Sequence, residues 1–304
     1  MRGILFCTWL LLLTRALGCG DAFAQDTASE EAARRASVLA HLPPDAAQRV
    51  FGNETAPAPG PPEAIGSYER GCLEGAAALP ADGPNWQVMR PSRNRAWGHP
   101  FLIDLLERLA QKLPAEASWP GLLVGDIAQP RGGPMVTGHG SHQIGLDADI
   151  WLTPMPSRRL SATERNEMSA TDVVAADGQD VDEATWTPQH HRLLEAAARE
   201  PGVERIFVNP AIKRALCRET GSDRAWLAKI RAWWGHNYHF HMRLFCPSGQ
   251  PECQPQAPPP PGDGCGKELD WWFTPEARHP PKRPAKPLLL GDLPRACAKL
   301  VGAR

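Results

Sequence analysis

Excess charge of one sign and long apolar runs are both scarce in this sequence of 304 residues. The chain carries 33 Lys and Arg against 34 Asp and Glu, a formal net charge of −1. Proteins that bind nucleic acid usually owe much of their affinity to positive charge, so we expect no nucleic-acid partner. No stretch approaches the roughly 20 apolar residues that a spanning helix needs. The sequence therefore predicts no stable membrane insertion.

The start of the chain holds the only notable apolar run, from about Ile4 to Leu13. A basic residue precedes it, and Ala22-Phe23-Ala24 supplies a small-residue cleavage site, which is typical of a secretory signal peptide. We predict a signal peptide over residues 1–24 and export to the periplasm. A lipid-modified Cys19 is the alternative; it is disfavoured because Ala16 stands where a lipidation site favours leucine.

The mature chain lacks any C-x-x-C pair, which argues against a zinc site made of thiolates. Of eight cysteines, Cys7 and Cys19 leave with the signal peptide, so six remain. An even number in an oxidising compartment predicts three disulfides. Fifteen pairings of six cysteines are possible, and spacing favours only one bridge, Cys246 with Cys253 across a short loop.

A regular alternation of strand and helix is also missing, and no internal repeat is present. Residues 25–63 are polar and rich in alanine and proline, with one modest helical stretch (EEAARRASVLAHL) that ends at Pro43-Pro44. This composition predicts a flexible N-terminal arm. Residues 274–304 predict a proline-rich C-terminal tail, and residues 64–273 can form one compact domain. Mixed short elements predict an α+β fold, with a small, mostly antiparallel sheet flanked by helices and disulfide-held loops.

Apolar spacing predicts the individual elements of this domain. Helices are expected at 99–113, 188–200, 209–217 and 223–235, and strands within 119–130 and at 147–152, 205–209 and 239–245. His190 and His191 fall on the helix at 188–200 and are expected at the surface. The tryptophans are expected mostly in the core or lining a groove.

Metal-binding side chains gather in two short stretches. Residues 135–151 contain His139, His142, Asp147 and Asp149 among glycines. In the predicted strand at 239–245, His239 and His241 are two residues apart and face the same side. Two or three imidazoles with one carboxylate form a tetrahedral zinc site that leaves a position for water. A lone histidine is more often structural, but the clustering of several predicts a catalytic zinc centre.

These segments resemble a known family. The pattern SHxxGxDxD at 141–149 with HxH at 239–241 is similar to the LAS group of zinc peptidases. Within that group the chain is most similar to the penicillin-insensitive murein endopeptidases. The shared segments, in order, are GSYERGC (66–72), VMR (88–90), GHP (98–100), TGHGSH (137–142), RIFVNPAIK (205–213), HMRLFCP (241–247) and GDGCG (262–266).

The resemblance implies roles for individual residues and makes residues 64–273 a zinc metallopeptidase domain. It implies that His142, Asp149 and His241 hold zinc and that His139 is a further candidate ligand. His239 would be the general base, and His236 a second imidazole that stabilises the anionic intermediate. The resemblance also implies three disulfides, which join Cys72 to Cys297, Cys217 to Cys265, and Cys246 to Cys253.

One position departs from the family. Asp177 matches a residue linked to a second metal, and is therefore a candidate ligand. Its family partner is a histidine, where this chain has Asp180. This difference argues against a second zinc.

The expected function is a zinc-dependent murein endopeptidase, insensitive to penicillin, that hydrolyses the D-alanyl–meso-diaminopimelyl cross-links of peptidoglycan, with a homodimer possible. One alternative is a D,D-carboxypeptidase or dipeptidase of the same group, which would need a fixed cation for the terminal carboxylate. Another is a non-catalytic, zinc-stabilised protein that binds the cell wall. His239 argues against the latter, because a structural site has no use for a spare base.

Overall fold

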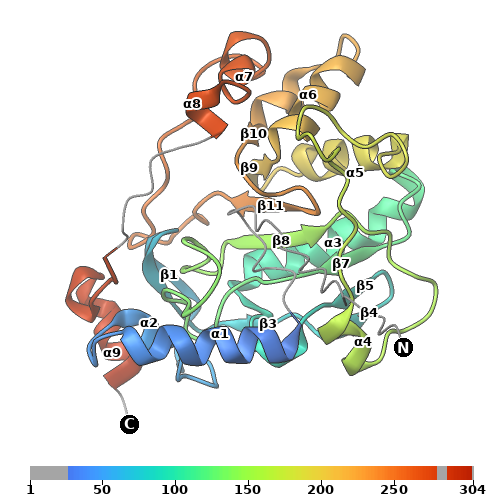
Figure 1. Cartoon of the computed structure of the whole chain (residues 1–304). Coiled ribbons are helices and arrows are strands. Elements are labelled where there is room, and N and C mark those ends of the chain that lie inside the picture. The colour runs from blue at the N-terminus through green and yellow to red at the C-terminus, as the bar shows by residue number, and fades with distance from the viewer. Residues whose placement is uncertain (1–26, 279–285, 303–304) are drawn as a thin grey trace, which may run out of the picture.

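The main element of the fold is a seven-stranded sheet with the order β10-β9-β11-β8-β7-β5-β4 (Figure 1). The computed structural model describes residues 27–278 and 286–302, so the predicted signal peptide lies outside the described residues. The strands of this sheet, in chain order, are β4 (Asp82–Gly83), β5 (Trp86–Val88), β7 (Leu122–Val124), β8 (Asp147–Trp151), β9 (Val203–Val208), β10 (Ile230–Ala232) and β11 (His239–Leu244).

Pairing within this sheet is mostly antiparallel, as predicted. The neighbours β9–β11, β11–β8, β8–β7 and β5–β4 are antiparallel, whereas β10–β9 and β7–β5 are parallel. Two smaller antiparallel ladders join β1 (Glu63–Ser67) to β2 (Arg70–Glu74), and β3 (Ala77–Ala78) to β6 (Trp97–Gly98). The α+β class is therefore confirmed.

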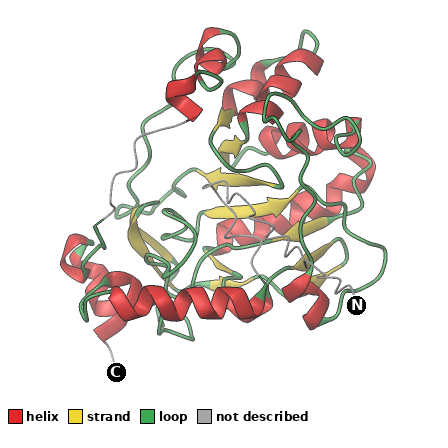
Figure 2. Ribbon diagram, viewed as in Figure 1, coloured by secondary structure: helices red, strands yellow, loops and turns green. Residues whose placement is uncertain are grey.

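Helices surround the sheet, and α3 (Pro100–Glu116) lies across one of its faces (Figures 1 and 2). Leu102, Leu105, Leu106, Leu109 and Leu113 recur on the buried side of this helix and enter the main core with strand residues such as Ile150 and Phe240. The other helices are α1 (Ala28–His41), α2 (Ala47–Phe51), α4 (Ala162–Glu167), α5 (Pro188–Arg199), α6 (Pro210–Glu219), α7 (Lys267–Trp271), α8 (Pro275–Arg278) and α9 (Arg295–Gly302).

The prediction of one helix over 223–235 is wrong. The segment forms a 3₁₀ turn at Ala225–Lys229 and then strand β10, which pairs in parallel with Ile206–Val208 of β9. The predicted helix and the observed 3₁₀ turn with its strand would both bury Leu227 and Ile230. Apolar spacing alone therefore could not distinguish the two structures. Backbone hydrogen bonds to β9 decide the outcome, an instance of tertiary context overriding local preference.

The expectation that His190 lies at the surface is also wrong. Its ring stacks on Trp186 at 5.2 Å and meets Trp119 edge-on at 5.0 Å. Nε2 donates to the Leu152 carbonyl at 2.9 Å, and burial lowers the pKa of this imidazole. Both ring nitrogens are satisfied, since Nδ1 also bonds Thr187 Oγ1 at 2.8 Å. A buried, fully bonded histidine here serves the core.

Three disulfides join the six cysteines in the expected pairs, and so confirm the framework. Cys72 on β2 bonds Cys297 on α9, which ties the C-terminal segment to the domain. Among the described residues, no helix is long and apolar enough to cross a bilayer.

The segment predicted as an arm contains two helices. Glu31 of α1 is buried and reaches Arg95 and Thr137, while Phe51 of α2 packs in a small core with Ile65 and Cys297. The division of the chain at residues 24, 63 and 273 stays a prediction.

Candidate metal centre

Two neighbouring strands provide the rigid part of the site. In the antiparallel pairing of β8 and β11, His241 lies directly opposite Asp149, and Arg243 lies opposite Asp147. Every residue of both strands is buried. Side chains two residues apart on a strand share a face, so the two aspartates meet the two histidines His239 and His241. The strand-based part of the prediction is present in the structure.

A glycine-rich loop before β8 provides the remaining histidines. His142 has a left-handed backbone conformation with φ of 65°, which is unfavourable for a residue with a Cβ. Its N–H donates to Asp147 Oδ2 at 3.0 Å, which holds the turn. Backbone strain of this kind is often found at functional sites. Here it turns the His142 ring toward Asp149.

Three ligand-type atoms converge at the centre of the cluster. His142 Nε2 lies 3.2 Å from His241 Nδ1 and 3.3 Å from Asp149 Oδ1, and His241 Nδ1 lies 3.4 Å from the same oxygen. Zinc–nitrogen bonds of about 2.0–2.1 Å in a tetrahedron give ligand-to-ligand distances of about 3.3–3.4 Å. The triangle therefore has the size that a tetrahedral metal ion needs.

Hydrogen bonds on the far sides of both rings fix which nitrogens face inward. His142 Nδ1 donates to the Ile127 carbonyl at 2.6 Å, and His241 Nε2 donates to Asp147 Oδ1 at 2.9 Å. The inward nitrogens are thus lone-pair acceptors, and they face a carboxylate oxygen. Within the described part of the chain, Asp149 Oδ1 has no hydrogen-bond partner. Three buried acceptors facing one point are stabilised by a positive charge between them.

The pKa shifts of the same three side chains also favour a positive charge at this point. Burial disfavours charge on Asp149, but the surrounding histidines, His239 first, outweigh it and hold the pKa of the carboxyl well below its usual range. Burial lowers the pKa of His142, and the Asp149 carboxylate outweighs it, so the net pKa is raised. Burial lowers the pKa of His241 to about 4. The centre therefore favours one positive charge, either a proton or a metal ion.

Asp147 contacts both sides of the centre. Besides bonding the His241 ring and the His142 backbone, its Oδ1 accepts from Arg243 Nε at 2.7 Å. Burial raises its pKa, and Arg243 and His241 more than reverse this, so it stays ionised. Carboxylates placed behind a ligand histidine orient the ring and raise its basicity. Asp147 makes this kind of contact with the His241 ring.

His139 lies on the other side of Asp149. Its Nδ1 is 3.5 Å from Asp149 Oδ2, and its Nε2 is 3.0 Å from Asp126 Oδ2. His139, His142 and Asp149 also form a group whose ligand atoms lie within 4.8 Å of one another, so this group too could hold a metal. Because both nitrogens of His139 already face carboxylates, the triangle of His142, Asp149 and His241 is the better fit.

A buried ion network holds the His139 loop from behind. Asp126 also accepts from Arg95 Nη1 at 2.9 Å and from Arg93 Nη1 at 3.2 Å. Arg95 Nη2 then bonds Thr137 Oγ1 at 2.9 Å and Glu31 Oε1 at 3.1 Å. Helix α1 is thereby linked through two ion pairs to a residue next to the metal centre.

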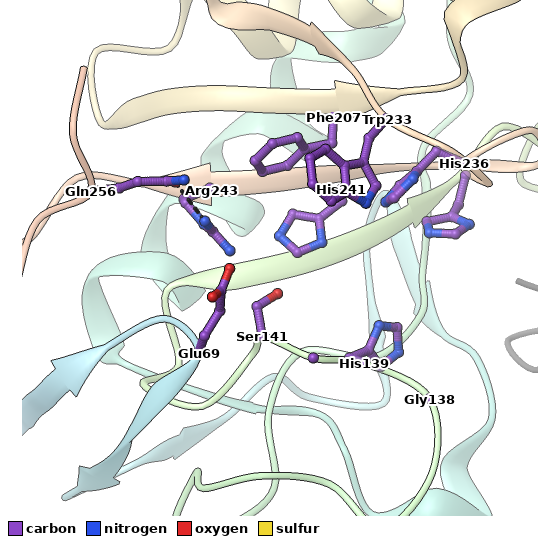
Figure 3. A pocket seen from close by; sticks show the side chains of 12 residues that line it. Glu69, Gly138, His139, Ser141, Phe207, Trp233, His236, His241, Arg243 and Gln256 are labelled. Atoms are coloured by element: carbon purple, nitrogen blue, oxygen red, sulfur yellow. Dashed lines mark hydrogen bonds between the residues drawn. The ribbon is translucent and has the colours of Figure 1, made fainter. Parts of the chain in front are cut away.

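The centre opens into a cleft of about 240 Å³ (Figure 3). His139, His236, His239 and His241 line it, together with Phe207, Trp233 and Arg243. His239 Nε2 is 3.6 Å from Asp149 Oδ2, and its Nδ1 has no hydrogen-bond partner among the described residues. Burial lowers the pKa of His239 to about 3, so its ring is neutral.

His236 is placed beside His239 by a second strained turn, with φ of 54° and 4.9 Å between the two ring centroids. Its Nδ1 donates to the Trp234 carbonyl at 2.9 Å. The structure therefore brings His139, His142, Asp149, His236, His239 and His241 into one site.

Asp177 is placed elsewhere. It is exposed, its Oδ1 accepts from the Gln179 backbone at 2.9 Å, and it does not line the cleft in the described part of the chain. Asp180, at the position where the family has a histidine, pairs with Arg218 at 2.6 Å instead. A metal at Asp177 stays a prediction, and the group of described residues at metal-binding spacing does not include it.

Asp126, Glu31 and Arg243 were not predicted from the sequence. Asp126 carried a usable signal, because a carboxylate directly follows the buried strand β7 and its neighbour Gly125. Glu31 carried none, since it lies in a polar helix far from the motif.

Comparison with known sequences identifies the family. The profile of the penicillin-insensitive murein endopeptidases matches residues 64–302. This chain belongs to that family. A penicillin-insensitive murein endopeptidase of Haemophilus influenzae is 48% identical over 249 residues, covering 79% of this chain and 82% of its own length. Enzymes with the same name from Yersinia enterocolitica (47% identical, 81% and 88% covered) and Klebsiella pneumoniae (44%, 81% and 89%) are also similar.

The family match covers every residue of the metal centre. It begins at residue 64, so α1 and its Glu31 lie before the matched region. The family membership establishes a murein endopeptidase-type hydrolase, and the geometry adds the side chains that could hold its metal.

Proposed function

We propose that this protein is a zinc metalloendopeptidase that hydrolyses D-alanyl–meso-diaminopimelyl cross-links between the stem peptides of peptidoglycan. The observation that carries the proposal is the convergence of His142 Nε2, His241 Nδ1 and Asp149 Oδ1 at 3.2–3.4 Å from one another. The hydrogen bonds behind both rings make these atoms acceptors, and the family to which the chain belongs cuts murein.

His142, Asp149 and His241 would hold the zinc. Bound there, zinc would supply an activated water at neutral pH and polarise the scissile carbonyl. The cleft beside these three side chains is lined by His236 and His239, where a substrate peptide would bind.

His239 would move the proton. Its ring is neutral because burial lowers its pKa, and its Nδ1 lacks a partner within the described residues. As general base it would take a proton from the attacking water, and as general acid it would return that proton to the leaving amine. Asp149 Oδ2, at 3.6 Å from Nε2, would stabilise the charged ring between the two steps.

His236 would stabilise negative charge on the tetrahedral carbon's oxygen. The Trp234 carbonyl accepts from Nδ1–H, so Nε2 would donate to the negatively charged oxygen when the ring is an imidazolium, with both nitrogens protonated. A donor preorganised toward developing charge lowers the barrier because no solvent has to reorganise. Since this mechanism uses no serine nucleophile, β-lactams should not acylate the enzyme.

Two variants of β11 test the assignment. His241→Ala removes a proposed ligand, so we expect both zinc content and activity to be lost. His239→Ala removes the proposed base, so we expect zinc to be retained and turnover to fall by about 10²–10⁴-fold. Zinc measured by atomic absorption, beside cleavage of purified muropeptide dimers, checks both. Loss of zinc in His239→Ala would show that the two histidines are assigned the wrong way round.

The products distinguish the alternatives. A cross-link endopeptidase converts dimers to monomers, whereas a D,D-carboxypeptidase releases terminal D-alanine, and a binding protein releases nothing. We further propose export to the periplasm, where this substrate lies.

A further inference from the structure

Two tryptophans beside the cleft are exposed to an unusual extent. Trp233 is 56% exposed and Trp271 is 53% exposed. Large exposed aromatic surfaces next to a cleft mark interaction sites, because apolar rings gain free energy when a partner covers them. Trp233 lines the cleft itself, directly after β10, and Trp271 ends helix α7.

These rings continue outward from the metal centre without a gap. The Phe207 ring packs edge-on against the His241 ring, with 5.3 Å between the ring centroids, and the Trp233 ring centroid lies 6.0 Å from that of Phe207. Trp272 lies 5.9 Å from Trp233, and Trp271 lies 5.2 Å from Trp272. The four rings Phe207, Trp233, Trp272 and Trp271 are called the aromatic platform below. It runs from the wall of the cleft to the outside of the molecule.

The outer part of the platform is fixed in place. The Cys217–Cys265 disulfide precedes α7, Glu268 of α7 forms an ion pair with Arg231, and Leu269 is buried. The buried Lys213 donates to the Asp263 carbonyl at 2.5 Å and holds the loop before the helix. Trp271 is therefore presented by an anchored helix, and ordering it would cost a ligand little entropy.

We propose that the aromatic platform binds sugar rings of the glycan strand whose stem peptide occupies the cleft. This inference rests on the proposed function for the identity of the polymer. A pyranose has a face of C–H groups that stacks on an aromatic face, and a rim of hydroxyls. Glu268 precedes Trp271 by three residues on α7 and is exposed, so its carboxylate can accept hydrogen bonds from such hydroxyls.

A second copy of this chain fits the platform less well. A tryptophan offers at most about 250 Å², so two half-exposed tryptophans supply about 250 Å² together. A stable interface buries about 800 Å² on each partner. The exposed aromatic surface is far below that area but suits one or two sugar rings.

The direct test measures the binding of soluble, peptide-free glycan strands to the zinc-loaded protein. Tryptophan fluorescence is used to monitor binding. We expect wild type to bind and Trp271→Ala to bind about three- to tenfold more weakly. Trp271→Phe keeps a ring and should recover most of the affinity. Phe245→Ala is the control, because Phe245 directly follows the end of β11, is 48% exposed and is not part of the platform.

Cleavage assays separate this inference from the proposed function. Trp271→Ala should raise KM for glycan-bearing cross-linked dimers and leave kcat/KM on the sugar-free peptide dimer unchanged. If wild type binds glycan strands but cuts neither dimer, the platform stands and the proposed endopeptidase activity fails. Equal glycan affinity in wild type and Trp271→Ala would overturn the platform. The proposal would also be overturned if wild type sediments as a dimer and Trp271→Ala as a monomer, because the platform would then be a dimer interface.

Discussion

The two halves of the proposed metal centre are held in different ways. Asp149 and His241 stand opposite each other on β8 and β11, where the backbone ladder fixes their separation. His142 and His139 stand on a loop, where His142 has a positive φ and glycines flank His139. In the strand half the sheet fixes the backbone and only the His241 ring needs a further hydrogen bond, to Asp147. The loop half depends on side-chain contacts with Asp147, Asp126 and, more remotely, Glu31.

This difference shows where precision comes from in a metal site. A ligand on a strand is placed by hydrogen bonds that the sheet forms anyway. A ligand on a loop is placed by groups that have no other purpose, so these groups are the sensitive points. Variants that remove these supporting groups should therefore affect the site to different degrees.

Asp147→Asn should have the largest effect, because Asp147 supports both halves. The change keeps the shape but removes the charge that orients His241 and pairs with buried Arg243. We expect zinc affinity to fall about 10–100-fold and the free energy of unfolding to fall by about 3–5 kcal/mol. Competition with a chelator and denaturant titration measure the two effects. Asp104→Asn, on the exposed side of α3, is the matched control; wild-type zinc affinity in Asp147→Asn would contradict the supporting role.

Glu31→Gln should act on the loop half alone. Glu31 is 7% exposed and pairs with Arg95, which in turn holds Asp126 behind His139. Leaving Arg95 with one neutral partner should cost about 1–3 kcal/mol of unfolding free energy, with a smaller loss of zinc affinity than in Asp147→Asn. The control is the exposed Glu30→Gln, because glutamine can keep the capping box with Thr27. Equal stability of the two variants would show that α1 does not support the loop.

The smallest effect is expected from the glycines on either side of His139. Gly138 has φ of 86°, whereas Gly140 has an ordinary φ and open space around its Cα. Gly138→Ala should lower stability by about 1 kcal/mol because alanine is strained there. Gly140→Ala should be neutral or stabilising by up to about 1 kcal/mol. Thermal unfolding measures both, and a larger loss in Gly140→Ala would mean that the loop changes conformation in solution.

The difference between side chains on strands and side chains on the loop also explains which parts of the site the sequence could predict. The HxH pattern on a strand placed His239 and His241 on one face correctly, because strand periodicity is local. The pairing of His241 with Asp149 spans 92 residues of chain, and register over that distance depends on the whole sheet. Asp126 and Glu31 act through loop and helix contacts that leave no periodic signal.

Apolar spacing gave a wrong prediction where two different secondary structures bury the same residues. Leu227 and Ile230 are spaced for a helix and are equally buried by a 3₁₀ turn and strand β10. His190 was misplaced for a related reason. Helical spacing gives the direction of a side chain, but only the neighbouring Trp119 and Trp186 show that this side of α5 is covered.

The Cys72–Cys297 bridge sets an order of events during synthesis. Its two cysteines are separated by 225 residues. At about 5–20 residues per second, Cys297 is added roughly 10–45 s after Cys72. Until Cys297 follows it into an oxidising compartment, Cys72 has no correct partner there. It can mispair with Cys217, Cys246, Cys253 or Cys265, all of which precede Cys297 in the chain. Maturation of this enzyme should therefore depend on a disulfide isomerase, in addition to an oxidant.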